Sequence, residues 1–173
     1  MKKDLYLAFD DADFWADFSF VDFTDGYLET MTSQVTQALA SMNELEKGAI
    51  ANPDENRMVG HYWLRAPERA PSEEITSAIQ ETIVKIKKLA KQVHQGELQA
   101  PAGPFTDLLI IGIGGSALGP QFVGRALGHP EHDRLAVHFF DNTDPDGLDL
   151  TLAEIGPGLS TTLALVISKS GGT

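Results

Sequence analysis

The chain has 173 residues, of which 42% are hydrophobic, and it contains no cysteine. This hydrophobic content supports a packed core and excludes intrinsic disorder, while the lack of cysteine excludes disulfides and thiolate metal sites. The formal net charge of −12 argues against nucleic acid or an anionic membrane as a partner, because both bind to basic surfaces. No apolar run reaches the ~18 residues that a membrane span needs, and the N-terminus lacks a signal-peptide core. We therefore expect a cytoplasmic protein.

The first hundred residues predict a mainly helical segment. Residues 10–25 are rich in Asp and Phe and are expected to form a surface segment that is anchored by its rings. Residues 27–47 carry apolar side chains at steps of three and four, and Gly48 is placed to end that helix. A second helix is expected after Ser72, with glutamates in its first turn and lysines in its second half, the order that the helix dipole favours. His61 lies among aromatic residues and is interpreted as structural.

The second part of the chain alternates apolar strands with helices. Residues 99–104 contain two prolines and a glycine, which places the expected boundary between a segment of residues 1–104 and a domain of residues 105–173. The order strand, helix, strand, helix, strand predicts the α/β class, with a parallel sheet and right-handed βαβαβ crossovers. Because a further helix should cover the third strand, we expect the N-terminal piece of a longer protein. The expected strands are residues 108–113, 135–140 and 163–167, and the expected helices are residues 120–127 and 146–155.

Two of the three expected strands end in loops that are rich in glycine and hydroxyl groups. The first strand opens into Gly114-Gly115-Ser116, and the third opens into Ser168-Lys169-Ser170-Gly171-Gly172-Thr173. Backbone N–H groups at the start of a helix bind anions, phosphate above all, and glycines let the backbone approach the ligand closely. Neighbouring parallel strands place such loops at the same edge of the sheet. The pair of loops therefore predicts one phosphate site.

A dinucleotide site is the main alternative for the first loop. Gly112-x-Gly114-x-x-Ala117 satisfies the relaxed fingerprint of nicotinamide-dependent dehydrogenases, and Asp141 ends the second strand, where an acid would hold a ribose hydroxyl. Two features count against this alternative. Ser116 adds a hydroxyl that pyrophosphate binding does not require, and the hydroxyls and ammonium of the second loop have no evident role beside a nicotinamide. The second loop favours a single phosphomonoester.

Two short segments invite a metal interpretation. Asn142-x-Asp144-x-Asp146-Gly147 matches the opening of a calcium loop, but the closing acid, Glu154, comes one residue late. Asp146 is expected instead to cap the following helix. His129-Pro130-Glu131-His132 offers two histidines without an evident third ligand and is interpreted as a solvated turn. We expect no metal.

The two loops resemble those of the phosphoglucose isomerase family. Residues 111–120, Ile-Gly-Ile-Gly-Gly-Ser-Ala-Leu-Gly-Pro, resemble the first phosphate loop of that family, and residues 167–173, Ile-Ser-Lys-Ser-Gly-Gly-Thr, resemble the second. The turn at residues 140–145 and the segment of residues 60–67 are similar to bacterial, including cyanobacterial, members. The resemblance covers the whole chain but well under half of the usual family chain. It implies that residues 105–173 form the first part of a sugar isomerase (SIS) domain.

The resemblance also implies a function, the aldose–ketose isomerisation of glucose 6-phosphate and fructose 6-phosphate in glycolysis and gluconeogenesis. It implies a cytoplasmic homodimer that needs no cofactor or metal. A non-catalytic SIS-type module that binds sugar phosphates is the alternative. The family's catalytic groups lie in the part that this chain lacks, and no glutamate, histidine or arginine here matches their motifs. We therefore expect no catalytic residue in this fragment and no activity from it alone. The substrate-phosphate ligands that the resemblance implies are Gly115, Ser116, Ser168, Lys169, Ser170 and Thr173.

Overall fold

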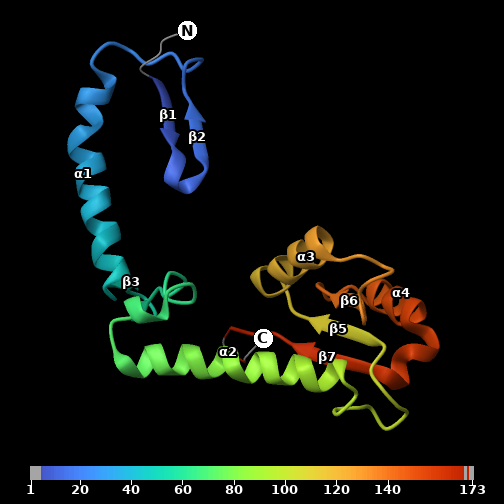
Figure 1. The fold of residues 1–173 in the computed structure, drawn as a ribbon. Coiled ribbons are helices and arrows are strands. Elements are labelled where there is room, and N and C mark those ends of the chain that lie inside the picture. The colour runs from blue at the N-terminus through green and yellow to red at the C-terminus, as the bar shows by residue number, and fades with distance from the viewer. Residues whose placement is uncertain (1–4, 170, 172–173) are drawn as a thin grey trace. The chain divides into compact units, whose positions relative to one another are not determined.

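The computed structural model describes residues 5–169 and residue 171 (Figure 1). The chain forms two compact units, residues 1–80 and residues 81–173. The division falls inside one long helix, α2 (Glu73–His94). Within the described part of the chain, no helix combines the length and the apolar character that crossing a bilayer requires.

The first unit begins with a β-hairpin. Strand β1 (Tyr6–Phe9) pairs antiparallel with β2 (Phe14–Asp17), and a short 3-10 turn joins them. The sequence prediction missed this hairpin because each strand has four residues and β1 lacks the alternation of apolar and polar side chains. The segment lies on the surface, as expected. Its rings remain partly exposed, however, with Phe14 at 56% and Trp15 at 51%.

Helix α1 (Tyr27–Glu46) agrees with the first predicted helix to within one residue. Gly48 follows it with a φ of +97°, which is the left-handed conformation expected of a glycine that ends a helix. A second hairpin comes next, formed by β3 (Ile50–Asn52) and β4 (Arg57–Met58). No residue of α1 is buried within the described structure, so this helix adds little to the core of its unit.

Trp63 is the main buried residue of the first unit, with 4% of its surface exposed. Its indole N–H donates to the carbonyl of Glu46 at 2.9 Å, at the end of α1. The Glu46 carboxylate in turn lies 2.8 Å from the guanidinium of Arg69. Ser72 caps α2 as predicted, because its hydroxyl accepts from the amide of Ile75 at 3.3 Å. The hydroxyl of Thr76 in α2 donates to the carbonyl of Pro67 at 2.8 Å, so residues 60–67 bond both to the end of α1 and to the start of α2.

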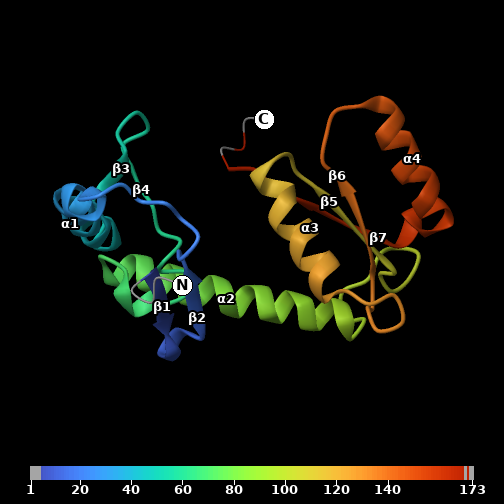
Figure 2. The same ribbon diagram turned by 90° about the horizontal axis from the view of Figure 1, so that it is seen from above.

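The second unit contains the predicted parallel sheet, which confirms the α/β class. Its strands are β5 (Asp107–Ile111), β6 (Ala136–Phe140) and β7 (Thr162–Val166), in the spatial order β6-β5-β7. Helices α3 (Gly115–Leu127) and α4 (Pro145–Ile155) flank the sheet on opposite sides (Figure 2). Two right-handed crossovers in opposite directions produce this arrangement.

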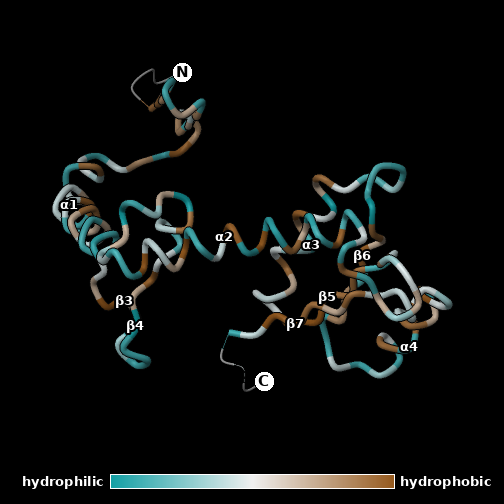
Figure 3. The backbone as a smooth tube through the Cα atoms, turned by 60° about the horizontal axis from the view of Figure 1, so that its bottom comes forward, coloured by the Kyte–Doolittle hydropathy of each residue, from teal (hydrophilic) through white to brown (hydrophobic). Residues whose placement is uncertain are grey.

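The core of the second unit lies on the central strand. Leu109 and Ile110 are 5% and 6% exposed, and Ala117 of α3 and Ile155 of α4 are also buried, with 2% and 5% of their surface exposed. Strand β5 stands out as hydrophobic in Figure 3. A strand that is buried on both faces needs an unbroken apolar run, which is why this part of the fold was readable from sequence.

One predicted helix start and one predicted helix cap were wrong. Helix α3 begins at Gly115 and not at residue 120, so Pro120 lies inside the helix. Proline favours the first turn of a helix, and this preference misplaced the boundary. Helix α4 is capped by Asp144, whose carboxylate accepts from the amide of Gly147 at 3.0 Å. Asp146 was predicted to be the cap but lies within the first turn.

Candidate functional site

The first glycine loop, residues 112–114, joins β5 to α3. The amide of Gly112 donates to the carbonyl of Phe140 at 3.0 Å, so the loop starts firmly attached to β6. Gly114 then turns the chain with a φ of +57°, and its carbonyl accepts from the amide of Ala117 at 3.0 Å. The amides of Gly114 and Gly115 donate to no acceptor among the described residues. They lie at the positive end of a 13-residue helix, where an anion is stabilised.

The second loop follows β7. The amide of Ile167 donates to the carbonyl of Ile111 at 2.9 Å, which extends the pairing of β7 with β5 by one step. The hydroxyl of Ser168 accepts from the amide of Gly171 at 2.9 Å, and Gly171 has a φ of +72°. This bond joins Ser168 and Gly171, on either side of Lys169 in the sequence. Ser170 and Thr173, which the sequence analysis placed in the site, lie outside the described residues.

The two loops meet at the same edge of the sheet, as the sequence predicted. Ile111 is in register with Val166 on one side and with Phe140 on the other. A Cβ atom built on Gly112 would lie 3.2 Å from the carbonyl oxygen of Ile167. Ser116 and the start of the second loop thus both lie beside Gly112. That Gly115, Ser116, Ser168 and Lys169 form one phosphate site stays a prediction.

Asp141 directly follows β6 at this same edge, and its carboxylate already accepts hydrogen bonds from protein groups. Its carboxylate accepts from the side-chain amide of Gln121 at 2.7 Å and from that of Asn142 at 2.9 Å. The two bonds use different oxygens, and the bond from Gln121 ties α3 to the end of β6. The dinucleotide alternative would need this carboxylate to receive a ribose hydroxyl. The observed partners give Asp141 a structural role instead.

The two segments with a metal interpretation are organised by their own hydrogen bonds. Asn142 accepts from the amide of Asp144 at 2.8 Å, and the Asp144 carboxylate caps α4. The rings of His129 and His132 stack with their centroids 4.4 Å apart. Among residues 5–169 and 171, no three His, Asp or Glu side chains converge as metal ligands.

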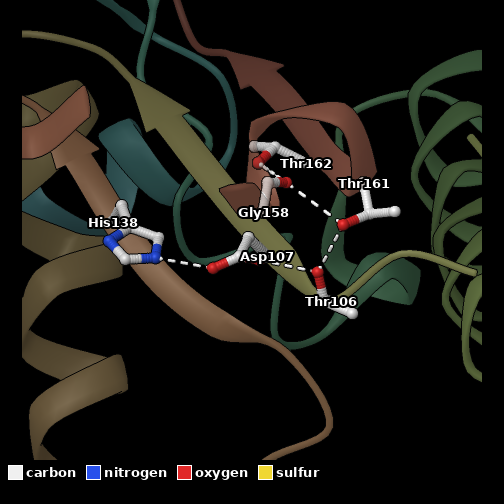
Figure 4. A network of polar contacts seen from close by, with 6 residues as sticks. All are labelled: Thr106, Asp107, His138, Gly158, Thr161 and Thr162. Atoms are coloured by element: carbon white, nitrogen blue, oxygen red, sulfur yellow. Dashed lines mark hydrogen bonds and ion pairs between the residues drawn. The ribbon is translucent and has the colours of Figure 1, made fainter. Parts of the chain in front are cut away.

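A polar network lies at the opposite end of the sheet and was missed by sequence reasoning (Figure 4). The Asp107 carboxylate lies 2.9 Å from the Nε2 atom of His138 and accepts from the hydroxyl of Thr106 at 2.7 Å. The Thr106 and Thr161 hydroxyls are 2.6 Å apart. The hydrogen bond from Thr106, followed by that from His138, holds the pKa of Asp107 below its usual value, against the opposing effect of burial. The signal was a histidine inside an otherwise apolar strand.

This network joins three chain segments rather than facing a ligand. Thr106 and Asp107 start β5, His138 lies in β6, and Thr161 ends the 3-10 turn that precedes β7. The side chains of His138 and Asp107 are only 15% and 14% exposed. Ligands of parallel α/β sheets bind at the carboxyl ends of the strands. The network lies at the opposite end, where it holds β5, β6 and the start of β7 together.

Comparison with known proteins agrees with this geometry. A family model described as phosphoglucose isomerase matches residues 17–173. The chain is 61% identical over 158 residues to the glucose-6-phosphate isomerase of Geobacter sp. (strain M21), an alignment that covers 91% of this chain and 30% of that protein. It is 55% identical over 162 residues to the glucose-6-phosphate isomerase of Synechococcus elongatus, covering 93% of this chain and 30% of that protein. The chain thus spans about 30% of the length of these curated relatives.

Proposed function

The chain belongs to the phosphoglucose isomerase family, and on that premise we propose that it holds the phosphate of a sugar phosphate for a glucose-6-phosphate isomerase. The observation that carries the proposal is the meeting of two glycine-rich loops at one edge of the sheet. One loop starts a helix and the other contains a lysine. A phosphomonoester dianion is the ligand that suits free amides, hydroxyls and one ammonium within a single small site.

The proposed ligands divide between the loops. The amide of Gly115 and the amide and hydroxyl of Ser116 would bind from the N-terminus of α3, where the helix dipole favours negative charge. The second loop would add the hydroxyls of Ser168, Ser170 and Thr173 and the ammonium of Lys169. A tetrahedral phosphate has acceptor oxygens that point in several directions, so ligands from two loops can share it. We expect that neither loop alone would surround such a group.

The phosphate site would serve the reaction by orientation. The isomerisation moves a proton between C2 and C1 of the sugar, at the other end of the molecule from the 6-phosphate. Binding energy from a remote, non-reacting group positions the reacting carbons and so contributes to the rate. We propose that the groups that move the proton lie in the portion of the relatives that this chain does not cover. From the family we also propose that the parent protein is a cytoplasmic homodimer. From the prolines and glycine of residues 99–104 we propose a domain boundary near residues 104–105.

Calorimetry with glucose 6-phosphate tests the proposal directly. The wild-type chain is expected to bind glucose 6-phosphate and not glucose, because the phosphate supplies the contacts. Ser116→Ala should weaken binding by about 2 kcal/mol, the scale of a hydrogen bond to a charged group. Ser160→Ala is the matched control, because the Ser160 hydroxyl bonds to the carbonyl of Pro157 at 3.3 Å, in the turn before β7. Equal loss in both variants, or equal affinity for glucose, would reject the site.

A spectrophotometric assay tests the division of labour. The wild-type chain is expected to convert no glucose 6-phosphate to fructose 6-phosphate, although it binds the sugar phosphate. Turnover that scales with the concentration of the pure chain would show that the reacting groups had been placed in the wrong part of the protein.

A further inference from the structure

We propose that Gly112 is a positioning residue that sets the separation of the two phosphate loops, an inference that rests on the proposed function. Gly112 is not among the phosphate ligands assigned above. It lies at the end of the central strand, where the chain leaves β5 for the first loop. The proposal concerns the space around its Cα atom.

Gly112 is enclosed by three neighbours. Its amide donates to the carbonyl of Phe140 at 3.0 Å, which fixes it to β6. A Cβ atom at this position would lie 2.9 Å from the Cβ of Ser116 and 3.0 Å from the Ser116 carbonyl oxygen. The same atom would lie 3.2 Å from the carbonyl oxygen of Ile167, where the second loop begins. One missing methyl group therefore allows both loops to approach the same strand end.

The need for glycine here is spatial and not conformational. Gly114 and Gly171 adopt positive φ values of +57° and +72°, a region that favours glycine. Gly112 is not among the glycines with a positive φ, so its φ lies outside the region that favours glycine. Within α3, by contrast, a Cβ atom on Gly119 or Gly124 would meet no atom within 4 Å. Close approach thus distinguishes Gly112 from the other glycines of the loop and the helix.

The neighbours cannot easily yield to a methyl group. Two of the three closest atoms are backbone carbonyl oxygens, which do not rotate away as the end of a long side chain does. An alanine at position 112 must therefore displace the start of α3, the start of the second loop, or both. Ser116 lies in the first turn of α3, and Ser168 follows Ile167 on the second loop. Such a displacement would therefore separate the two hydroxyls that are proposed to share one phosphate. Misplacement of binding groups by about 1 Å costs up to about a hundredfold in function.

The test compares Gly112→Ala with Gly124→Ala, using glucose 6-phosphate as the probe and calorimetry of the whole chain. Gly112→Ala is expected to weaken binding by at least about tenfold, since a misplacement of about 1 Å can cost up to about a hundredfold. Gly124→Ala is expected to bind glucose 6-phosphate as the wild type does. Thermal unfolding of each variant identifies those that remain folded. Unchanged affinity in folded Gly112→Ala would overturn the inference, whereas failure of the wild-type chain to bind would instead reject the proposed function.

A double-mutant cycle separates positioning from general destabilisation. Ser168→Ala should weaken binding in the wild-type background and have little further effect in the Gly112→Ala background, because the second loop no longer reaches the phosphate. Equal effects in both backgrounds would contradict the inference. If Gly112→Ala does not fold, a crystal structure of the wild-type chain with glucose 6-phosphate decides the question. Close contact of Gly112 with the Ile167 carbonyl supports the inference, and a gap wide enough for a methyl group overturns it.

Discussion

The carboxylate of Asp107 and the imidazole of His138 lie 2.9 Å apart, across β5 and β6 and at the end of the sheet that is remote from the glycine loops. Thr106 donates a second hydrogen bond to that carboxylate at 2.7 Å. In a parallel sheet of three strands, the apolar pattern is the main feature that specifies the register of neighbouring strands. This pair supplies one, because it joins the start of the central strand to the middle of its neighbour.

The lowered pKa of Asp107 predicts a loss of stability in acid. The folded state favours the charged carboxylate, so its contribution is fully present above the pKa of the unfolded chain, near 3.9. The contribution falls as the pH drops below that value and is lost as the pH passes through the lower pKa of the folded state. Urea unfolding between pH 6 and pH 2 should show this loss in the wild type and less of it in Asp107→Asn. Parallel curves for the two proteins would contradict the prediction.

The hydrogen bond of the buried Trp63 predicts that removal of its N–H lowers the free energy of unfolding. Trp63→Phe keeps an aromatic ring but removes the N–H that donates to Glu46 at 2.9 Å. We expect a loss of about 1 kcal/mol in the free energy of unfolding, the net contribution of one hydrogen bond. Trp15→Phe is the control, because Trp15 is 51% exposed, and surface substitutions usually stay within about 0.5 kcal/mol. Similar losses for both variants in chemical denaturation would argue against the Trp63 bond.

Gly114 in the first loop and Gly124 within α3 predict opposite effects of alanine on stability. Gly124 lies within α3 and has no atom within 4 Å of a built Cβ, so Gly124→Ala should stabilise the chain by about 0.5–1 kcal/mol. Gly114 has a φ of +57°, and Gly114→Ala should destabilise it by about 1 kcal/mol or more. Thermal unfolding measures both. An increase in the melting temperature of Gly114→Ala would show that the loop adopts another conformation in solution.

The sequence predicted the structure best where a single requirement, such as burial of a strand on both faces, determines the residue types. The buried run around Leu109 and Ile110 predicted the central strand, and the glycines after it predicted the loop at the ligand edge. The hairpin of β1 and β2 was not predictable in the same way, because its stability comes from backbone pairing over two short strands. Capping by Asp144 rather than Asp146 is a choice between two similar residues, and only the local hydrogen bonds decide it.

The contact between Asp107 and His138 shows a second limit of sequence reasoning. The two residues are 31 positions apart, and their encounter depends on the register of two parallel strands. A histidine in an apolar strand signals an unusual environment but does not identify its partner. Gly112 is a similar case, because a glycine in a glycine-rich loop gives no sign that its value lies in close packing against Ile167.

The engagement of Asp141 predicts that its charge is unimportant for sugar-phosphate binding. Asp141→Asn removes an acceptor for Gln121 or Asn142, which now bond at 2.7 Å and 2.9 Å, so we expect a lower melting temperature. The affinity for glucose 6-phosphate should stay within about threefold of the wild type, because that factor corresponds to less than one typical hydrogen bond. Calorimetry measures the affinity of each protein for glucose 6-phosphate and for NAD. Binding of NAD by the wild type, and its loss in Asp141→Asn, would favour the dinucleotide site and contradict the assignment of the loops to a phosphomonoester.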